Sequence, residues 1–333
     1  MQLSHVRPVV SATFDEPNLV GAAGLVPLMS LARKAGLREL ADERMSVPTD
    51  KGANAGLKLS SLVAGMAAGA DSIDDMALLR HGGMGKVFTG AYAPSTLGSF
   101  LRSFAFGHVR QADAVASRFL LNLAEHTRLL GGVEDAGTVL LDIDDTIVEV
   151  HGYQKQGAAF GYSGVRGLNA LLATVSTETI APVIAAQRLR KGSVGSPRGA
   201  ARLATDALAL IRRSQLTGRH VLVRADSAFY SHALVTAALN AGADVSITVR
   251  MDPAVKRAIT GIAEDGWSTI KYTDAIYDET TSTWISKAQV AEIPFTAFTS
   301  KKKADQVPGR LIVRRIPELN PKHSDGQETL FDT

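Results

Sequence analysis

The spacing of apolar residues divides the chain into a helical first part and a later part in which strands and helices alternate. From about residue 17 to residue 130, apolar positions recur every three or four residues, a spacing that predicts amphipathic helices. Gly and Pro residues fall in the gaps between these segments. The predicted helices lie at 18–37, 56–70, 72–81, 93–104 and 111–130. We therefore expect an all-α N-terminal domain at residues 1–131.

The pattern changes near Gly131 to runs that are rich in Leu, Val and Ile and too short for typical helices. Three such runs follow one another and predict strands at 137–150, 167–179 and 180–190. Alternating elements come next: a helix at 196–218, a strand at 220–229, a helix at 231–242, a strand at 244–251 and a helix at 252–265. This order predicts an α/β domain at 132–265, a mixed sheet with flanking helices. It is the layout of the ribonuclease H fold, in which the first strand lies centrally and the fourth runs beside it.

The last part of the chain is again different in character. Residues 266–320 contain short β-rich runs, which we expect to form a β-rich insertion. Residues 321–333 are polar and rich in turn-forming residues, and they predict a tail.

Composition limits the chemistry that the chain can use. The 333 residues include no cysteine, which excludes disulfides, thiolate zinc sites and cysteine nucleophiles. No apolar stretch is long enough for a membrane span, and the N-terminus lacks the layout of a signal peptide. We therefore expect a cytoplasmic protein without membrane contact. The net charge of +3 says little alone, but cations cluster around 187–202, 212–213 and 301–315, as suits binding of a polyanion.

Acidic residues stand at the ends of two predicted strands. The first strand carries Asp142, Asp144 and Asp145 within an apolar run, although an unpaired buried carboxylate costs several kcal/mol. Asp226 ends the fourth strand. Because neighbouring strands bring these ends together, their carboxylates are suited to a hard cation such as Mg²⁺. Strand alternation puts Asp142 and Asp144 on one face and Asp145 on the other, so only one of these sets points at the metal.

The first acidic motif has a second interpretation. Asp142-Ile143-Asp144-Asp145-Thr146 fits the D-x-D-x-T pattern of haloacid-dehalogenase-type phosphatases, with Asp142 as the nucleophile. That family completes its Mg²⁺ site with a second acidic cluster on a later strand, and no such cluster follows here. The phosphatase remains the alternative hypothesis.

Long stretches of the chain resemble DDE transposases of bacterial insertion sequences, in the branch whose catalytic domain carries a β-rich insertion. "SIDDMALLRHGG" and "APSTLGSFLRSF" are similar to the N-terminal segment of that group. "LLDIDDTIVEVHGYQKQGAAFGYSGVRGLNALLA" resembles its first catalytic block and "HVLVRADSAFYS" its second. "AEIPFTAFTSKKK" and "RLIVRRI" resemble the late part of the insertion. The resemblance implies a ribonuclease H-like core that cleaves and joins DNA strands with Mg²⁺ or Mn²⁺.

Carried over residue by residue, the resemblance implies that Asp145, which precedes Thr146, and Asp226 are the first two catalytic residues and metal ligands. Asp142 or Asp144 takes the place of Asp145 if the register differs by a residue. The resemblance also implies contacts with substrate DNA in the Gly-rich block after the first strand. The candidate DNA-binding residues are Tyr153, Tyr162, Arg188, Arg190, Lys191, Arg198 and Arg224, and an ion pair of Arg224 with the Asp cluster is the alternative.

The third catalytic residue of the family is a Glu on a helix after the insertion, and no convincing counterpart is present. We therefore expect a C-terminally truncated transposase that is inactive alone, whose partners are double-stranded DNA (transposon ends and target) and a second copy of the chain bound to DNA. Such a protein is cytoplasmic and associates with the nucleoid when it binds DNA.

Overall fold

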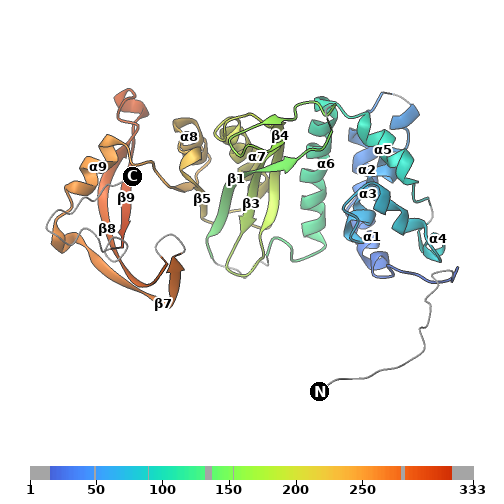
Figure 1. Ribbon diagram of the computed structural model, residues 1–333, viewed down its shortest axis with the longest axis horizontal. Helices are drawn as coiled ribbons and strands as arrows, with labels where there is room; N and C mark the ends of the chain where they lie inside the picture. Colours follow the sequence, from blue (N-terminus) through green and yellow to red (C-terminus); the bar gives the residue numbers. More distant parts are fainter. Residues whose placement is uncertain are drawn as a thin grey trace, which may run out of the picture. The chain divides into compact units, whose positions relative to one another are not determined.

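The computed structural model describes residues 16–316, except 49, 89, 132–136, 153 and 279–281. The chain separates into two compact units, residues 1–247 and 248–333 (Figure 1). The predicted boundary at residue 265 falls within the second unit, and the predicted tail at 321–333 lies outside the described residues.

The first half of the first unit is helical, as the apolar spacing predicts. Its α-helices are α1 (Leu25–Lys34), α2 (Leu37–Arg44), α3 (Ala55–Ala67), α4 (Met84–Val87), α5 (Pro94–Arg102) and α6 (Phe106–Glu125). Leu97 and Phe100 are fully buried in a cluster that α2, α3, α5 and α6 share. The segment predicted as a helix at 72–81 is a 3₁₀-helix, Asp74–Arg80. At its start the amide and hydroxyl of Ser72 both donate to the carboxylate of Asp75.

The second half of the unit is a mixed sheet, which confirms the predicted α/β class. Its strands are β1 (Val139–Glu149), β2 (Ala159–Phe160), β3 (Arg166–Ser176), β4 (Val183–Lys191), β5 (Val221–Ala225) and β6 (Asp244–Ile247). The order is β2-β3-β1-β5-β6, and β4 pairs with β3. β1 is antiparallel to β3 and parallel to β5, and β5 is parallel to β6. β1 therefore lies in the middle of the sheet beside β5, so the acidic residues in the middle of β1 lie next to the carboxyl end of β5.

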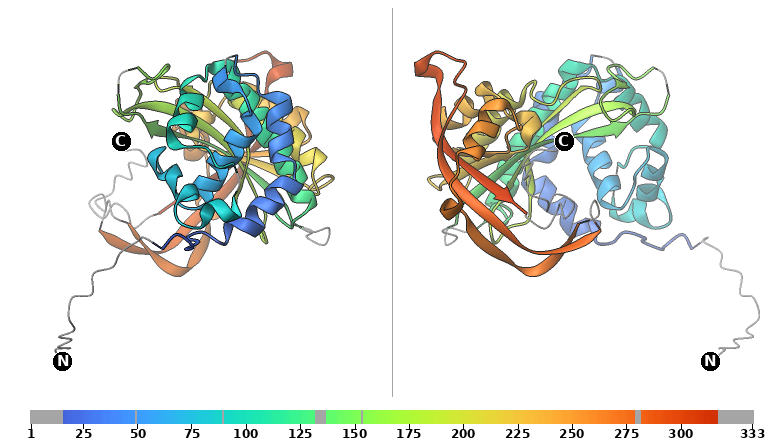
Figure 2. Two further views of the ribbon diagram at one scale, coloured as in Figure 1. Left: turned by 90° about the vertical axis from the view of Figure 1, so that its right-hand side faces the viewer. Right: turned by 60° about the vertical axis from the view of Figure 1, so that its left-hand side comes forward.

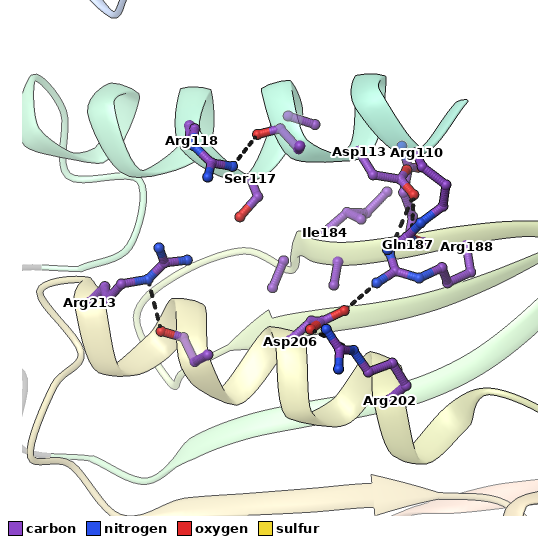
Figure 3. A pocket seen from close by; sticks show the side chains of 15 residues that line it. Arg110, Asp113, Ser117, Arg118, Ile184, Gln187, Arg188, Arg202, Asp206 and Arg213 are labelled. Carbon is purple, nitrogen blue, oxygen red and sulfur yellow. Dashed lines mark hydrogen bonds and ion pairs between the residues drawn. The ribbon is translucent and has the colours of Figure 1, made fainter. Parts of the chain in front are cut away.

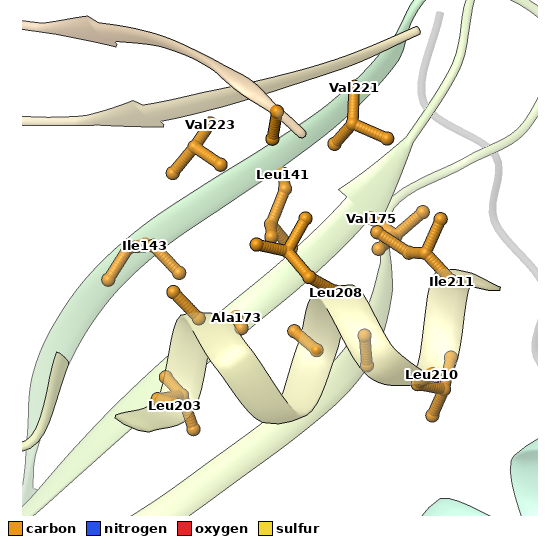
Figure 4. Packing of buried hydrophobic residues seen from close by; sticks show 14 of the residues in the cluster. Leu141, Ile143, Ala173, Val175, Leu203, Leu208, Leu210, Ile211, Val221 and Val223 are labelled. Atoms are coloured by element: carbon orange, nitrogen blue, oxygen red, sulfur yellow. The ribbon is translucent and has the colours of Figure 1, made fainter. Parts of the chain in front are cut away.

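Helices α6, α7 (Ala200–Arg213) and α8 (His232–Asn240) contribute buried residues to the apolar layer of this sheet. α7 packs against β3, β4 and α8. Leu141 and Ile143 of β1 share one buried cluster with Leu203 and Leu208 of α7 (Figure 4). Burial of each such side chain contributes about 1.5–3 kcal/mol. One face of β1 therefore packs in the hydrophobic core, so an acidic residue on that face is buried and one on the other face is not.

Glycines allow two strands and a loop to approach closely at one edge of the sheet. The amide of Gly192, directly after β4, donates to the carbonyl of Gly157 at 3.0 Å. A Cβ atom on Gly192 would lie 2.0 Å from the carbonyl oxygen of Gly167 and 2.4 Å from that of Ala159. The backbone around Gly192 is therefore so closely packed that no larger residue fits at this position.

The second unit holds α9 (Pro253–Thr260) and an antiparallel sheet of β7 (Ser268–Asp278), β8 (Thr283–Ala297) and β9 (Val307–Arg315), in that order. Figure 2 shows the long β8–β9 pair in orange and red. Val255 and Ile259 of α9 are buried with Leu311 of β9. Among the described residues, no helix is long and apolar enough to cross a membrane.

Candidate active site

The acidic residues of β1 lie on two opposite faces of the sheet. Val139, Leu141 and Ile143 alternate along the buried face (Figure 4). Because successive side chains of a strand point to opposite sides, Asp145 continues this buried face, whereas Asp142 and Asp144 lie on the other. The three carboxylates of one short motif therefore have different surroundings.

Asp145 is held in a buried polar network. Its Oδ2 accepts hydrogen bonds from Nδ2 of Asn169 at 2.8 Å and from Nη2 of Arg190 at 2.7 Å, and its Oδ1 accepts from Oγ of Ser196 at 3.3 Å. The side chain of Asp145 is 5 % exposed, that of Arg190 10 % exposed, and Asn169 is 1 % exposed. Burial lowers the pKa of Arg190, and the charge of Asp145 partly opposes this shift. The carboxylate of Asp145 is thus shielded from solvent, its charge is paired with that of Arg190, and both of its oxygens accept hydrogen bonds.

The same arginine fixes the loop that leads into α7. Nε of Arg190 donates to Oδ1 of Asn169 at 2.8 Å, and Nη1 donates to the backbone carbonyls of Ser196, at 3.1 Å, and of Arg198. β1, β3, β4 and the loop before α7 therefore meet at one satisfied cluster. Buried ionic groups are tolerated only when their hydrogen bonds are satisfied in this way.

On the opposite face, Asp142 forms a bidentate ion pair with Arg224 of β5. Nε of Arg224 donates to Oδ1 at 2.7 Å, and Nη2 donates to Oδ2 at 2.8 Å. The hydrogen bond to Asp142 raises the pKa of Arg224. Both oxygens of Asp142 therefore accept hydrogen bonds from Arg224. In this structure Arg224 forms the ion pair with the Asp cluster that was the alternative to contact with DNA.

Asp144 and Asp226 are neighbours at the point where the parallel pairing of β1 and β5 ends, in the middle of β1 and directly after β5. The last paired residues of β1 and β5 are Ile143 and Ala225, and each acid follows directly. Asp226 has an extended backbone, so alternation along β5 places it on the face of Asp144. Both residues are exposed.

Each of these two carboxylates accepts one local hydrogen bond. Oδ1 of Asp144 accepts from the amide of Asp145 at 2.7 Å, and Oδ1 of Asp226 accepts from the amide of Ala228 at 2.9 Å. Two exposed carboxylates on one edge are oxygen donors of the kind that Mg²⁺ and Mn²⁺ prefer. Within the described residues, however, no group of three or more His, Asp or Glu side chains is placed to hold a metal ion.

The predicted DNA-binding residues have different surroundings. Arg188 pairs with Asp113 and Asp206, whereas Arg190 donates to Asp145 and to the backbone carbonyl of Arg198. Lys191 and Arg198 are exposed, Tyr162 is 80 % exposed, and Tyr153 lies outside the described residues. Their role in binding DNA stays a prediction.

Sequence reasoning missed Asn169 and Ser196, which hold Asp145. The signal for Asn169 is a polar residue inside the apolar run of β3. Ser196 lies in a turn-rich loop and gives no comparable signal, because its partner is 51 positions away in the sequence.

A pair of exposed carboxylates on neighbouring strands of a mixed sheet, with an arginine beside them, is typical of proteins that act on phosphate esters through a divalent metal. Comparison with known families identifies the chain more closely. The family of the transposase DDE domain, group 1, matches residues 3–322, and the chain belongs to this family. Membership makes DNA the partner of the chain, and such proteins typically use a divalent metal. A search of curated proteins finds no match.

Proposed function

We propose that the chain is the transposase of a bacterial insertion sequence, which cleaves and joins DNA strands with Mg²⁺ or Mn²⁺ on a ribonuclease H-like sheet. The family match over residues 3–322 supports this proposal. So does the strand order, in which the antiparallel strands β4, β3 and β1 are followed by the parallel strands β5 and β6. Transposon ends and target DNA are the substrates, and a DNA-bound homodimer is the expected assembly.

The metal ligands in this proposal are Asp144 and Asp226. The sequence prediction placed the first ligand at Asp145, with Asp142 and Asp144 as neighbours in an alternative register. One observation carries the choice of Asp144: the carboxylate of Asp145 is 5 % exposed and occupied by Arg190, whereas Asp144 is exposed and directly follows the residue that pairs with Ala225. Asp145 then acts as a positioning residue.

The side chains around this pair have separable tasks. The amide of Asp145 holds one oxygen of Asp144, and the amide of Ala228 holds one oxygen of Asp226, so both carboxylates are oriented before a cation binds. Arg224 engages both oxygens of Asp142 and adds a positive charge beside the two ligands. Asp144 and Asp226 would hold the divalent ion, which would supply activation of a water molecule or a 3′-hydroxyl and stabilisation of the leaving oxygen.

The expected inactivity of the chain alone stays a prediction: within the described residues, no third acidic side chain joins Asp144 and Asp226. Two carboxylates hold a cation less rigidly than three, so we expect slow DNA nicking at best. The phosphatase hypothesis requires Asp142 as a nucleophile, and the bidentate contact with Arg224 disfavours that role.

Calorimetric titration with Mn²⁺ tests the proposed ligands. We expect Asp144→Asn and Asp226→Asn to weaken Mn²⁺ binding at least tenfold, since each removes one charged oxygen donor. Asp145→Asn and Asp142→Asn are matched controls that remove the same charge from the same strand, and both should bind Mn²⁺ within about twofold of the wild type. Loss of binding in Asp145→Asn, with a native circular dichroism spectrum, would restore Asp145 as the ligand. Nicking of supercoiled DNA by the same variants tests the activity itself.

A further inference from the structure

A groove rich in arginine lies between α6 and α7, with β4 as its floor (Figure 3). Its volume is about 520 Å³, within the range of ligand sites. Five guanidinium groups and two carboxylates line it, a formal excess of three positive charges. The charged members are Arg110, Asp113, Arg118, Arg188, Arg202, Asp206 and Arg213.

Three of the arginines form ion pairs with the two carboxylates. Arg188 donates to both Asp113, at 3.3 Å, and Asp206, while Arg110 pairs with Asp113 at 3.0 Å and Arg202 with Asp206 at 3.2 Å. Burial raises the pKa of Asp113, although the neighbouring arginines oppose this shift. One end of the groove therefore holds an ionic cluster of three arginines and two carboxylates, with one positive charge in excess.

The other end carries positive charge without a carboxylate partner. Nη1 of Arg118 donates to the carbonyl of Ala114, and Nε of Arg213 donates to the carbonyl of Ala209. No carboxylate in the described part of the chain pairs with either guanidinium. These backbone contacts engage one nitrogen of each guanidinium and leave the others for a ligand. The hydroxyl of Ser117 points from α6 into the groove beside them (Figure 3).

The floor of the groove is apolar. Ala185 is buried, and Ile184 is 52 % exposed although it is a large aliphatic residue. A ligand that fits has anionic groups for the arginines and an apolar body for the floor. A sugar–phosphate backbone has both: phosphate oxygens match the fork of a guanidinium, and the deoxyribose faces are apolar.

We propose that the groove between α6 and α7 is a phosphate-binding site in which Arg118, Arg213 and Ser117 hold the backbone of DNA. The inference rests on the proposed function and adds a DNA contact separate from the carboxylates of β1 and β5. Phosphate contacts of this kind fix the position of a protein on the duplex without reading its sequence. The occupant shares its chemistry with free inorganic phosphate, and the experiment separates these two sources.

The test measures the binding of a fluorescent duplex by the full chain over a series of salt concentrations. Each phosphate contact contributes about 0.9 to the slope of log affinity against log salt concentration. The double variant Arg118→Gln/Arg213→Gln should therefore lower the magnitude of the slope by about 2. The control Arg128→Gln/Arg212→Gln removes two exposed charges from positions next to the same helices but outside the groove. Its slope should equal that of the wild type.

Two further measurements complete the test. Arg118→Lys/Arg213→Lys keeps the charge and should keep the slope, which excludes loss of folding as the cause. Titration with inorganic phosphate, followed by ³¹P NMR, gives the second source: an unchanged DNA slope with phosphate binding that the Gln variant loses means that the site takes free phosphate. An unchanged slope without phosphate binding overturns the proposal. The metal site is scored separately: Arg118→Gln/Arg213→Gln should bind Mn²⁺ as tightly as the wild type does, so a lower slope with intact Mn²⁺ binding concerns the groove alone.

Discussion

At the scale of single residues, three acidic positions within four residues of one strand have three different environments. Sequence alternation predicts that Asp145 lies opposite to Asp142 and Asp144, and the structure has this arrangement. Which face points to solvent cannot be read from the motif, because partners 24 and 45 positions away, Asn169 and Arg190, decide it. The local motif therefore specifies which acidic residues share a face of the strand, but not the role of each residue.

The ion pair of Asp145 and Arg190 should contribute strongly to folding. In Arg190→Met the carboxylate of Asp145 is left buried without its charged partner, and the loss of one member of a buried pair costs about 3–5 kcal/mol. Asp145→Asn keeps an acceptor for Asn169 and removes only the charge, so it should cost less. Urea denaturation of both variants gives the two free energies of unfolding. Equal, small losses would show that the network is not structural.

At the scale of elements, the strands follow the sequence closely. The runs of β1, β3 and β4 are recognised because their Leu- and Val-rich patterns end at Gly, Pro and polar residues. α2, with the sequence LRELADER, was missed because it is mostly polar. The sequence did not predict the groove between α6 and α7, since it needs the packing of two helices that residues 126–199 separate, which no local pattern encodes.

The carboxyl of Asp113 in this groove should make stability depend on pH. Burial raises its pKa above the ordinary value of 3.8 in the folded chain. The stabilising contribution of such a group is present below the unfolded pKa and is lost as pH rises through the folded pKa. We therefore expect the free energy of unfolding of the wild type, relative to Asp113→Asn, to fall as pH increases from 3.8 upward. Denaturation curves of both proteins across this range measure the difference, and a difference that grows with pH would contradict the expectation.

At the scale of the whole molecule, the chain is two units, each with its own buried cluster. Sequence analysis placed a change of character at residue 265, where β-rich runs begin, whereas the contacts separate the units after Ile247. The difference arises because α9 packs on the antiparallel sheet through Val255 and Ile259. The periodicity of a segment predicts that it forms a helix. It does not predict which other element of the chain the helix packs against.

Since Asp144 and Asp226 both belong to the first unit, a fragment of residues 1–247 should keep the metal site. We expect it to show a cooperative thermal transition and to bind Mn²⁺ within about threefold of the full chain. Scanning calorimetry and Mn²⁺ titration of the fragment check these outcomes. A folded fragment without Mn²⁺ affinity would mean that residues of the second unit contribute a ligand.

The close approach at Gly192 has a consequence for surveys of mutational tolerance. Its missing side chain lets three stretches of backbone stack, and even a methyl group would lie 2.0 Å from a carbonyl oxygen. A selection that scores every substitution in the chain should therefore reject nearly all changes at this glycine, as it would at a ligand of the metal. Gly195, three residues later, has only the ring of Pro197 at 4.0 Å and should accept many. Positions of this loop that tolerate no substitution would thus indicate steric crowding. Only an intolerant position that is also an exposed acidic residue would indicate a catalytic role.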